Sequence, residues 1–287
     1  MPGRGSRCDN PAAVDDSEMM HDVDAIADAL DGEHPEIALD LAVAAMRRSD
    51  EPDPLLHYFA GRALLDLDRP TAALAHLDRA VRIDPDDLDY RTDLAHALFR
   101  CCRFEEATAT LAPALESAPN RAESHELRAL LFEREGRFDE ADRHFALASR
   151  LDPPRFPVPT RLSPAAFERE VVAAGERLPE PFHRHLAEVA VTVDDVPGLD
   201  VLRSSGEAGE PFEPAETLGL FVGVPITERS FDGAGELPPR ILLFRRNLER
   251  FAAGEGDLRE QIAITLYHEL GHYLGMEEDD LERVDLA

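Results

Sequence analysis

Small and apolar residues recur every 34 positions through the middle of the chain, which is typical of stacked helical pairs. Small residues at two positions of the repeat let paired helices approach closely. A larger apolar residue fills the space between neighbouring pairs, and a proline ends each second helix. The matched sets are Pro85, Pro119 and Pro153; Ala73, Ala107 and Ala141; Ala80, Ala114 and Ala148; and Leu77, Leu111 and Phe145.

A divergent pair of helices is predicted upstream of these repeats. Glu36–Met46 has the pattern of a second helix, and His21–Leu30 would be its first helix. A stack of repeats needs a terminal element that closes its end, and a divergent repeat commonly has this role. We expect residues 1–20 to be a disordered tail.

The pattern changes after the last repeat. Closely spaced prolines predict a stiff, extended linker over residues 156–162. Ser163 and Pro164 then have the order of an N-cap and a first helical residue, and predict a helix through about Arg177. Short apolar runs predict three strands, and a last helix is expected to begin near Asp257 with a capping-box start at Glu260. The predicted strands are Leu186–Val193, Leu218–Val224 and Ile241–Phe244.

The predicted organisation is therefore an α-helical solenoid followed by a small α+β domain. Residues 21–155 would form the helical repeats and residues 163–287 the α+β domain. Hydrophobic residues make up 44% of the 287 residues, which is enough to build both cores.

Charge and cysteine content exclude several function classes. The chain has 59 acidic residues against 30 basic ones, all arginine, and its net charge of −29 would repel nucleic-acid backbones and anionic membranes. Three cysteines are too few for a disulfide framework, and we expect Cys101 and Cys102 to be a half-buried pair on a helix. No apolar run has the length of a membrane span, and residues 1–10 lack the hydrophobic stretch of a signal peptide. We expect a cytoplasmic protein.

The chemistry of the chain is concentrated in the sequence His-Glu-Leu-Gly-His at residues 268–272. On a helix, His268 and His272 lie one turn apart on the same face, where two imidazoles can hold one metal ion. Glu269 lies beside the first histidine but is offset around the helix, so its carboxylate can take a proton from a water molecule. This combination predicts metal-assisted hydrolysis.

A third metal ligand is expected beyond the end of this helix. Gly275 would end the helix in the left-handed conformation and let the acidic segment that follows fold back. Glu278 lies six residues after His272, and a carboxylate there is an acceptable zinc ligand. Asp279 is the alternative if the loop is shifted by one residue. It also stays open that the acidic run only solvates the end of the chain.

Both parts of the chain resemble known families. Residues 54–153 resemble the tetratricopeptide repeat, with Gly61 at that family's small position in the first helix. This resemblance implies a concave groove that binds a protein partner. The residues expected to face it are Leu55, Tyr58, Arg62, Asp89, Thr92, His96, Glu123 and Glu126. They lack the Lys and Asn pairs that clamp a carboxyl terminus, which favours a basic or mixed peptide.

His268–Asp280 resembles the minimal zincins, a family of small cytoplasmic bacterial metallopeptidase-like domains with the pattern His-Glu-x-x-His-x-x-Gly-x-x-Asp/Glu. The segments 218–230 and 238–250 are similar to the sheet and linker of that family. The resemblance implies a zincin-like fold, a Zn²⁺ ion bound by His268, His272 and Glu278, and Glu269 as the catalytic base. A zinc metallopeptidase acting on a peptide or protein substrate follows.

Two other functions compete with hydrolysis: a non-catalytic adaptor whose zinc is structural, and a sensor of metal availability. Several residues outside the motif are weaker candidates. We expect His183 and His185 to be exposed, with a position lining a cleft as the alternative. Tyr273 is expected to pack beside the sheet rather than stabilise an oxyanion. Arg245 and Arg246 are expected to be a solvated pair, with binding of a substrate carboxylate as the alternative.

Overall fold

The computed structural model describes residues 16–49, 51–180, 182–203, 215–228, 238–277 and 280–281. Their contacts divide the chain into two compact units, residues 1–98 with 105–116 and residues 99–104 with 117–287. This division does not test the predicted domain limits, which stay a prediction. None of the helices in the described part of the chain combines the length and apolar character needed to cross a bilayer.

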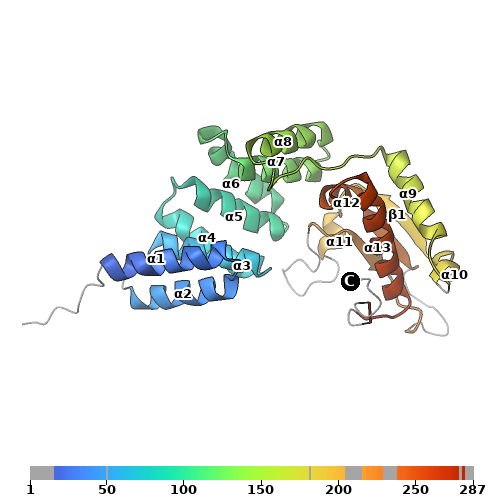
Figure 1. Ribbon diagram of the computed structural model, residues 1–287, viewed down its shortest axis with the longest axis horizontal. Helices are drawn as coiled ribbons and strands as arrows, with labels where there is room; N and C mark the ends of the chain where they lie inside the picture. The colour runs from blue at the N-terminus through green and yellow to red at the C-terminus, as the bar shows by residue number, and fades with distance from the viewer. Residues whose placement is uncertain are drawn as a thin grey trace, which may run out of the picture. The chain divides into compact units, whose positions relative to one another are not determined.

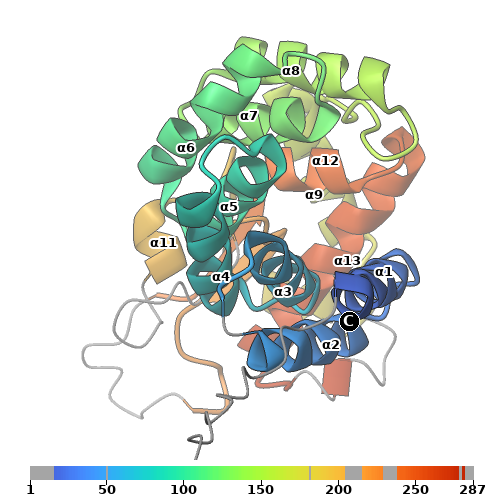
Figure 2. The same cartoon turned by 90° about the vertical axis from the view of Figure 1, so that its left-hand side faces the viewer.

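Consecutive pairs of helices form the first half of the chain (Figures 1 and 2). They are α1 (Asp16–Asp31) and α2 (Pro35–Arg48), α3 (Pro54–Asp66) and α4 (Pro70–Ile83), α5 (Leu88–Arg100) and α6 (Phe104–Ser117), and α7 (Ala122–Arg134) and α8 (Phe138–Leu151). The predicted small and apolar repeat positions of α4, α6 and α8 are all buried. A Cβ atom on Gly61 would lie 2.5 Å from Cγ of Leu77, so α3 and α4 depend on a glycine for their close packing. The predicted helical repeats are confirmed.

The turns inside the pairs repeat as regularly as the helices. Asp68, Cys102 and Gly136 are spaced 34 residues apart and have positive φ angles of 55°, 55° and 71°. Each residue occupies the left-handed turn between the two helices of a pair. The prediction that Cys101 and Cys102 lie on a helix is therefore wrong, because α5 ends at Arg100. An aspartate and a cysteine at a position better suited to glycine concealed this turn from the sequence pattern.

A three-stranded mixed sheet forms the centre of the C-terminal unit. The strands of the sheet and the helices that follow the repeats are α9 (Pro164–Glu176), α10 (Phe182–Leu186), β1 (Ala190–Asp194), α11 (Leu199–Arg203), β2 (Gly219–Val222), β3 (Arg240–Phe244), α12 (Arg245–Phe251) and α13 (Glu255–Tyr273). The central strand β3 pairs with β1 in parallel and with β2 in antiparallel orientation. Both β1 and β2 are therefore edges of the described sheet. The first predicted strand began too early, because Leu186 ends the short helix α10.

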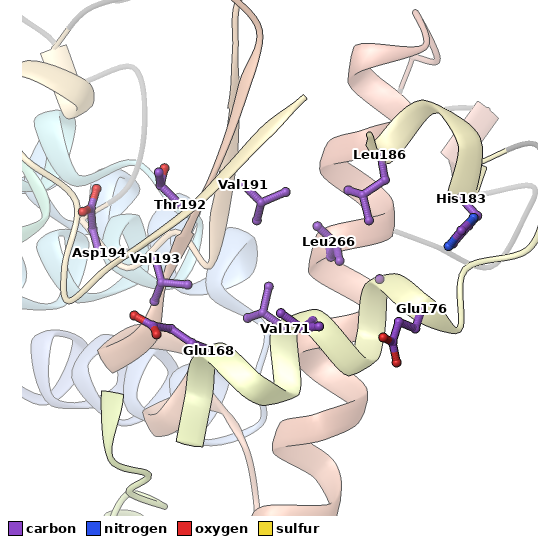
Figure 3. Close-up of a pocket in the computed structure, with 12 residues that line it drawn as sticks. Glu168, Val171, Glu176, His183, Leu186, Val191, Thr192, Val193, Asp194 and Leu266 are labelled. Atoms are coloured by element: carbon purple, nitrogen blue, oxygen red, sulfur yellow. The ribbon is translucent and has the colours of Figure 1, made fainter. Parts of the chain in front are cut away.

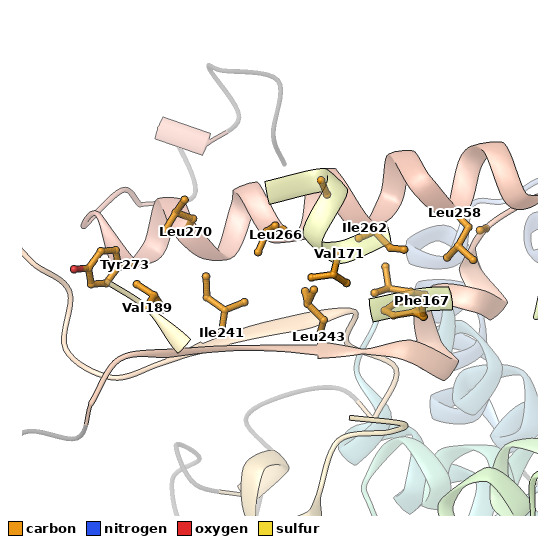
Figure 4. Packing of buried hydrophobic residues seen from close by; sticks show 13 residues of the cluster. Phe167, Val171, Val189, Ile241, Leu243, Leu258, Ile262, Leu266, Leu270 and Tyr273 are labelled. Carbon is orange, nitrogen blue, oxygen red and sulfur yellow. The ribbon is translucent and has the colours of Figure 1, made fainter. Parts of the chain in front are cut away.

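Helices α9 and α13 pack against the sheet through one apolar core (Figure 4). Ile241 and Leu243 of β3 contribute to this core together with Phe167 and Val171 of α9 and Leu266 of α13. Two expectations about helix starts have different outcomes. Ser163 caps α9 as predicted, since its Oγ accepts a hydrogen bond of 3.3 Å from the amide of Ala166. Helix α13 instead starts at Glu255, two residues before the predicted start.

Arg245 and Arg246 are buried, so the prediction of a solvated pair is wrong. Strand β3 runs directly into α12, and both guanidinium groups enter a cluster around the fully buried Glu249. Arg245 donates to Oε1 of Glu249 over 3.0 Å, and Arg161 donates to Oε2 over 3.2 Å. Arg161 also donates to Glu133 of α7 over 2.7 Å, so its side chain links α7 and α12 within the second unit. The two partners of Arg161 lie 28 and 88 residues away from it along the chain, so no local pattern could reveal them.

Candidate metal centre

Helix α13 brings the two predicted metal-binding histidines together. Nε2 of His268 and Nε2 of His272 are 3.0 Å apart, and their ring centroids are 4.7 Å apart. Zinc lies about 2.0–2.1 Å from a histidine nitrogen, so two nitrogen atoms at this separation can reach one ion. The pair therefore fits as two of the protein ligands of a metal.

Glu269 lies where α13 meets the edge strand β2. Its side chain is almost completely buried, with 7% exposed. A Cβ atom on Gly219 would come within 3.2 Å of Oε1 of Glu269 and within 2.6 Å of Cγ2 of Thr265. The absence of a side chain at Gly219 therefore lets the β2 backbone lie directly against the helix that carries the motif.

A cavity of about 430 Å³ opens between these two elements. Strand β2, the turn that follows it, and the end of α13 line the cavity. Its lining residues are Thr217, Gly219, Leu220, Phe221, Gly223, Pro225, Glu228, His268, Glu269, His272, Gly275, Met276 and Glu277. Both histidines and Glu269 thus face one space together with the edge strand. Sequence reasoning missed Glu228, because nothing in its local pattern relates it to a helix that begins 27 residues later.

The chain reverses at the predicted glycine after α13. Gly275 has a φ angle of +81°, and its amide donates to the carbonyl of His272 over 3.0 Å. The following amide, of Met276, donates to Gly271 over 3.0 Å. Leu281 is fully buried, and a Cβ atom on Gly271 would lie 2.4 Å from its Cδ2 atom. Leu281 therefore lies against the helix that carries the motif, and the predicted helix stop at Gly275 is confirmed.

The third ligand is not tested by this geometry. Glu278 and Asp279 both lie outside the described residues. Within the described ranges, no group of three His, Cys, Asp or Glu side chains is assembled to hold a metal ion. The identity of the third ligand stays a prediction.

Tyr273 is fully buried beside the sheet. Its hydroxyl donates a hydrogen bond of 2.8 Å to the carboxylate of Glu188, and its ring meets Phe221 edge-on at 5.9 Å. This arrangement matches the expected packing role and gives no support to oxyanion stabilisation.

The other candidates lie elsewhere. His183 is exposed and lines a separate groove beside β1, and His185 lies next to the ring of Tyr273 at 6.4 Å. Among the expected groove residues of the repeats, Thr92 is buried and donates to the carbonyl of Leu88 over 2.8 Å. Glu123 accepts a hydrogen bond of 2.5 Å from Arg155. Thr92 is therefore not available to a ligand, because its side chain points back into its own helix.

Comparison with known proteins supports the family resemblance predicted for each half of the chain. Residues 186–287 match a family described as zincin-like metallopeptidase, and residues 24–87 and 64–131 match two tetratricopeptide repeat families. No curated protein matches the chain.

Solved structures of repeat proteins cover about half of the chain. YrrB, a TPR protein with an unusual peptide-binding site, is 23% identical over 48% of this chain and 71% of its own, with a TM-score of 0.41. MamA AMB-1 is 20% identical over 48% of this chain and 81% of its own, with a TM-score of 0.41. TTC0263, a thermophilic TPR protein of Thermus thermophilus, is 22% identical over 54% of this chain and 79% of its own, with a TM-score of 0.42. The family matches give tetratricopeptide repeats within residues 24–131 and a zincin-like domain over residues 186–287, as the sequence predicted.

Proposed function

We propose that the protein is a zinc-dependent metallopeptidase whose repeats recruit a protein partner or substrate. The observation that carries this proposal is the convergence of His268 and His272 beside Glu269 in one cavity, next to an open strand edge. The match to a zincin-like family supports the same chemistry.

His268 and His272 would bind the metal through their Nε2 atoms as neutral imidazoles. Glu278 would complete the protein ligands, with Asp279 as the alternative. The fold-back of Leu281 onto Gly271 supports a ligand from this short segment, because the chain on both sides of it is held at the motif. Zinc bound there would polarise the peptide carbonyl and lower the pKa of a water molecule.

Glu269 would act as the catalytic base and then as the acid. Its carboxylate would accept a proton from the attacking water and return it to the nitrogen of the leaving amine. Burial against Gly219 limits the positions of this carboxylate, which favours a fixed line of proton transfer.

The substrate would lie extended along β2. This strand is an edge of the described sheet, and three of its residues line the cavity. A peptide added to such an edge gains main-chain hydrogen bonds without a requirement for one sequence. Its scissile bond would then lie against α13.

The repeats would supply recognition of a protein or peptide, for which the acidic chain favours a basic or mixed sequence. The three cysteines of the chain are too few for a disulfide framework, which is consistent with a reducing, cytoplasmic location. In the alternative function, the same repeats act as an adaptor and the metal only stabilises or senses.

Cleavage of an unbiased peptide library tests the proposal. Purified wild-type protein with zinc should cut a defined set of peptides, and the Glu269→Gln protein should not. Cutting by both proteins would identify a contaminant. No cutting by wild-type protein that holds zinc would favour the adaptor.

A further inference from the structure

A second groove lies at the opposite edge of the sheet, between β1 and α9 (Figure 3). It has a volume of about 640 Å³. Its walls are mainly apolar, and Val172 leaves 62% of its surface exposed there. The apolar lining residues are Val171, Val172, Leu186, Val191, Val193 and Leu266.

The outer edge of β1 offers main-chain groups beside this groove. The amide of Ala190 donates to the carbonyl of Pro239, and Ala190 is in register with Arg240 of β3. In a parallel ladder, the main-chain groups of alternate residues bond to the partner strand. The amide and carbonyl groups of Ala190, Thr192 and Asp194 therefore face β3. The amide and carbonyl groups of Val191 and Val193 therefore point away from the sheet. The side chains of these two valines point into the groove (Figure 3).

Carboxylates surround the apolar walls. Glu168 and Glu176 of α9 and Asp194 of β1 line the groove and are exposed. Among the residues that the structure describes, none of the three forms an ion pair, and no arginine lines the groove. Their close neighbours are paired: Glu170 with Arg259, and Asp195 with Arg245. The groove therefore presents negative charge that the surrounding protein does not neutralise.

The spacing of these charges fits an extended peptide. Glu168 and Glu176 are eight residues apart on one helix, which corresponds to about 12 Å along its axis. In an extended strand, side chains of residues i, i+2 and i+4 face the same side, and the first and last lie about 13 Å apart. Two basic side chains at i and i+4 would match the two glutamates, and an apolar side chain at i+2 would reach the valines between them.

We propose that this groove binds an extended peptide segment of the form Arg/Lys-x-Val/Ile/Leu-x-Arg/Lys, added as a strand to the outer edge of β1. The apolar walls, the open strand edge and the carboxylate spacing each select one feature of that ligand. Binding there requires neither zinc nor hydrolysis, so this site stands independently of the proposed peptidase activity.

Fluorescence anisotropy with labelled peptides tests the proposal in the full-length Glu269→Gln protein, which should leave the peptides uncut. The probe is Ser-Thr-Arg-Thr-Val-Thr-Arg-Thr-Ser, and its matched control is Ser-Thr-Thr-Arg-Val-Arg-Thr-Thr-Ser, which has the same composition with both arginines on the opposite face. The probe should bind at least tenfold more tightly than the control. Replacing both Glu168 and Glu176 with glutamine should remove that preference.

Backbone methylation distinguishes strand addition from simple charge attraction. N-methylation of one alternate set of probe residues should abolish binding, and N-methylation of the other set should be tolerated. Equal binding of probe and control, or tolerance of both methylated sets, would overturn the proposal. A dimer that the Glu168 and Glu176 substitutions disrupt, without peptide binding, would also overturn it by assigning the edge to a second copy of the chain.

Discussion

At one edge of the sheet, β2 lies directly against α13, whereas at the other edge a groove separates β1 from α9. The contact at β2 depends on Gly219, which brings the strand backbone next to Glu269. The gap at β1 is lined by Val191 and Val193, whose branched side chains fill part of the space between strand and helix. A single small sheet can thus present one edge to the polar groups of the His-Glu-Leu-Gly-His motif and the other edge to apolar side chains that carboxylates surround.

The largest effect is expected for a substitution that stops hydrolysis at the β2 edge and leaves peptide binding at the β1 edge unchanged. Glu269→Gln should lower peptide hydrolysis by about 10²–10⁴-fold, because a positioned general base contributes about that factor. Zinc content and probe binding at β1 should not change. Turnover of a peptide selected from the library, measured beside zinc content, checks this. Loss of zinc together with activity would instead make Glu269 a structural ligand.

Loss of the buried carboxylate of Glu249 should destabilise the sheet, and with it both of its edges. Glu249→Ala should reduce the free energy of unfolding by about 3–5 kcal/mol, because the buried Arg245 and the partly buried Arg161 would lose the carboxylate that they share. Urea unfolding measures this change. Glu255→Gln is the control, since its ion pair with Arg259 is exposed and should contribute less than about 1 kcal/mol. Similar losses in both variants would show that the buried cluster does not stabilise the sheet.

A methyl group at Gly219 should disturb the β2 edge without changing the β1 edge. Gly219→Ala would place Cβ 2.6 Å from Thr265 and should cost about 1–3 kcal/mol of stability while displacing Glu269. We expect hydrolysis to fall and probe binding at β1 to persist. Gly256→Ala is the matched control, because no atom lies within 4 Å of its added Cβ. Unchanged hydrolysis in Gly219→Ala would contradict a role of the close packing between β2 and Glu269 in the proposed activity.

The smallest effect on hydrolysis is expected for substitutions in the groove beside β1. Replacing Glu168 and Glu176 with glutamine should leave hydrolysis of a short neutral peptide within about twofold of wild type, since both side chains are exposed and lie outside the cavity of the motif. Steady-state kinetics measures this. A large loss of turnover would show that the two edges are coupled.

The sequence predicted those features that are set by local spacing. The 34-residue repeats, the cap at Ser163 and the stop at Gly275 all depend on residues close together along the chain. The placement of His268 and His272 on one helix face follows from the same kind of pattern.

Features set by distant residues could not be predicted in this way. The burial of Arg245 depends on Glu249 and on Asp195, 50 residues away. The cavity joins Glu228 to α13, and the groove at β1 arises only when α9 and the sheet pack together. Both require knowledge of which elements are neighbours in space.

Zinc content after equilibrium dialysis tests the central claim most directly. Wild-type protein and the Glu269→Gln variant should each retain about one zinc ion per chain, and a protein with both His268 and His272 replaced by alanine should retain none. Stoichiometric zinc in the double variant, or its absence from folded wild-type protein at neutral pH, would contradict a metal centre at this edge of the sheet.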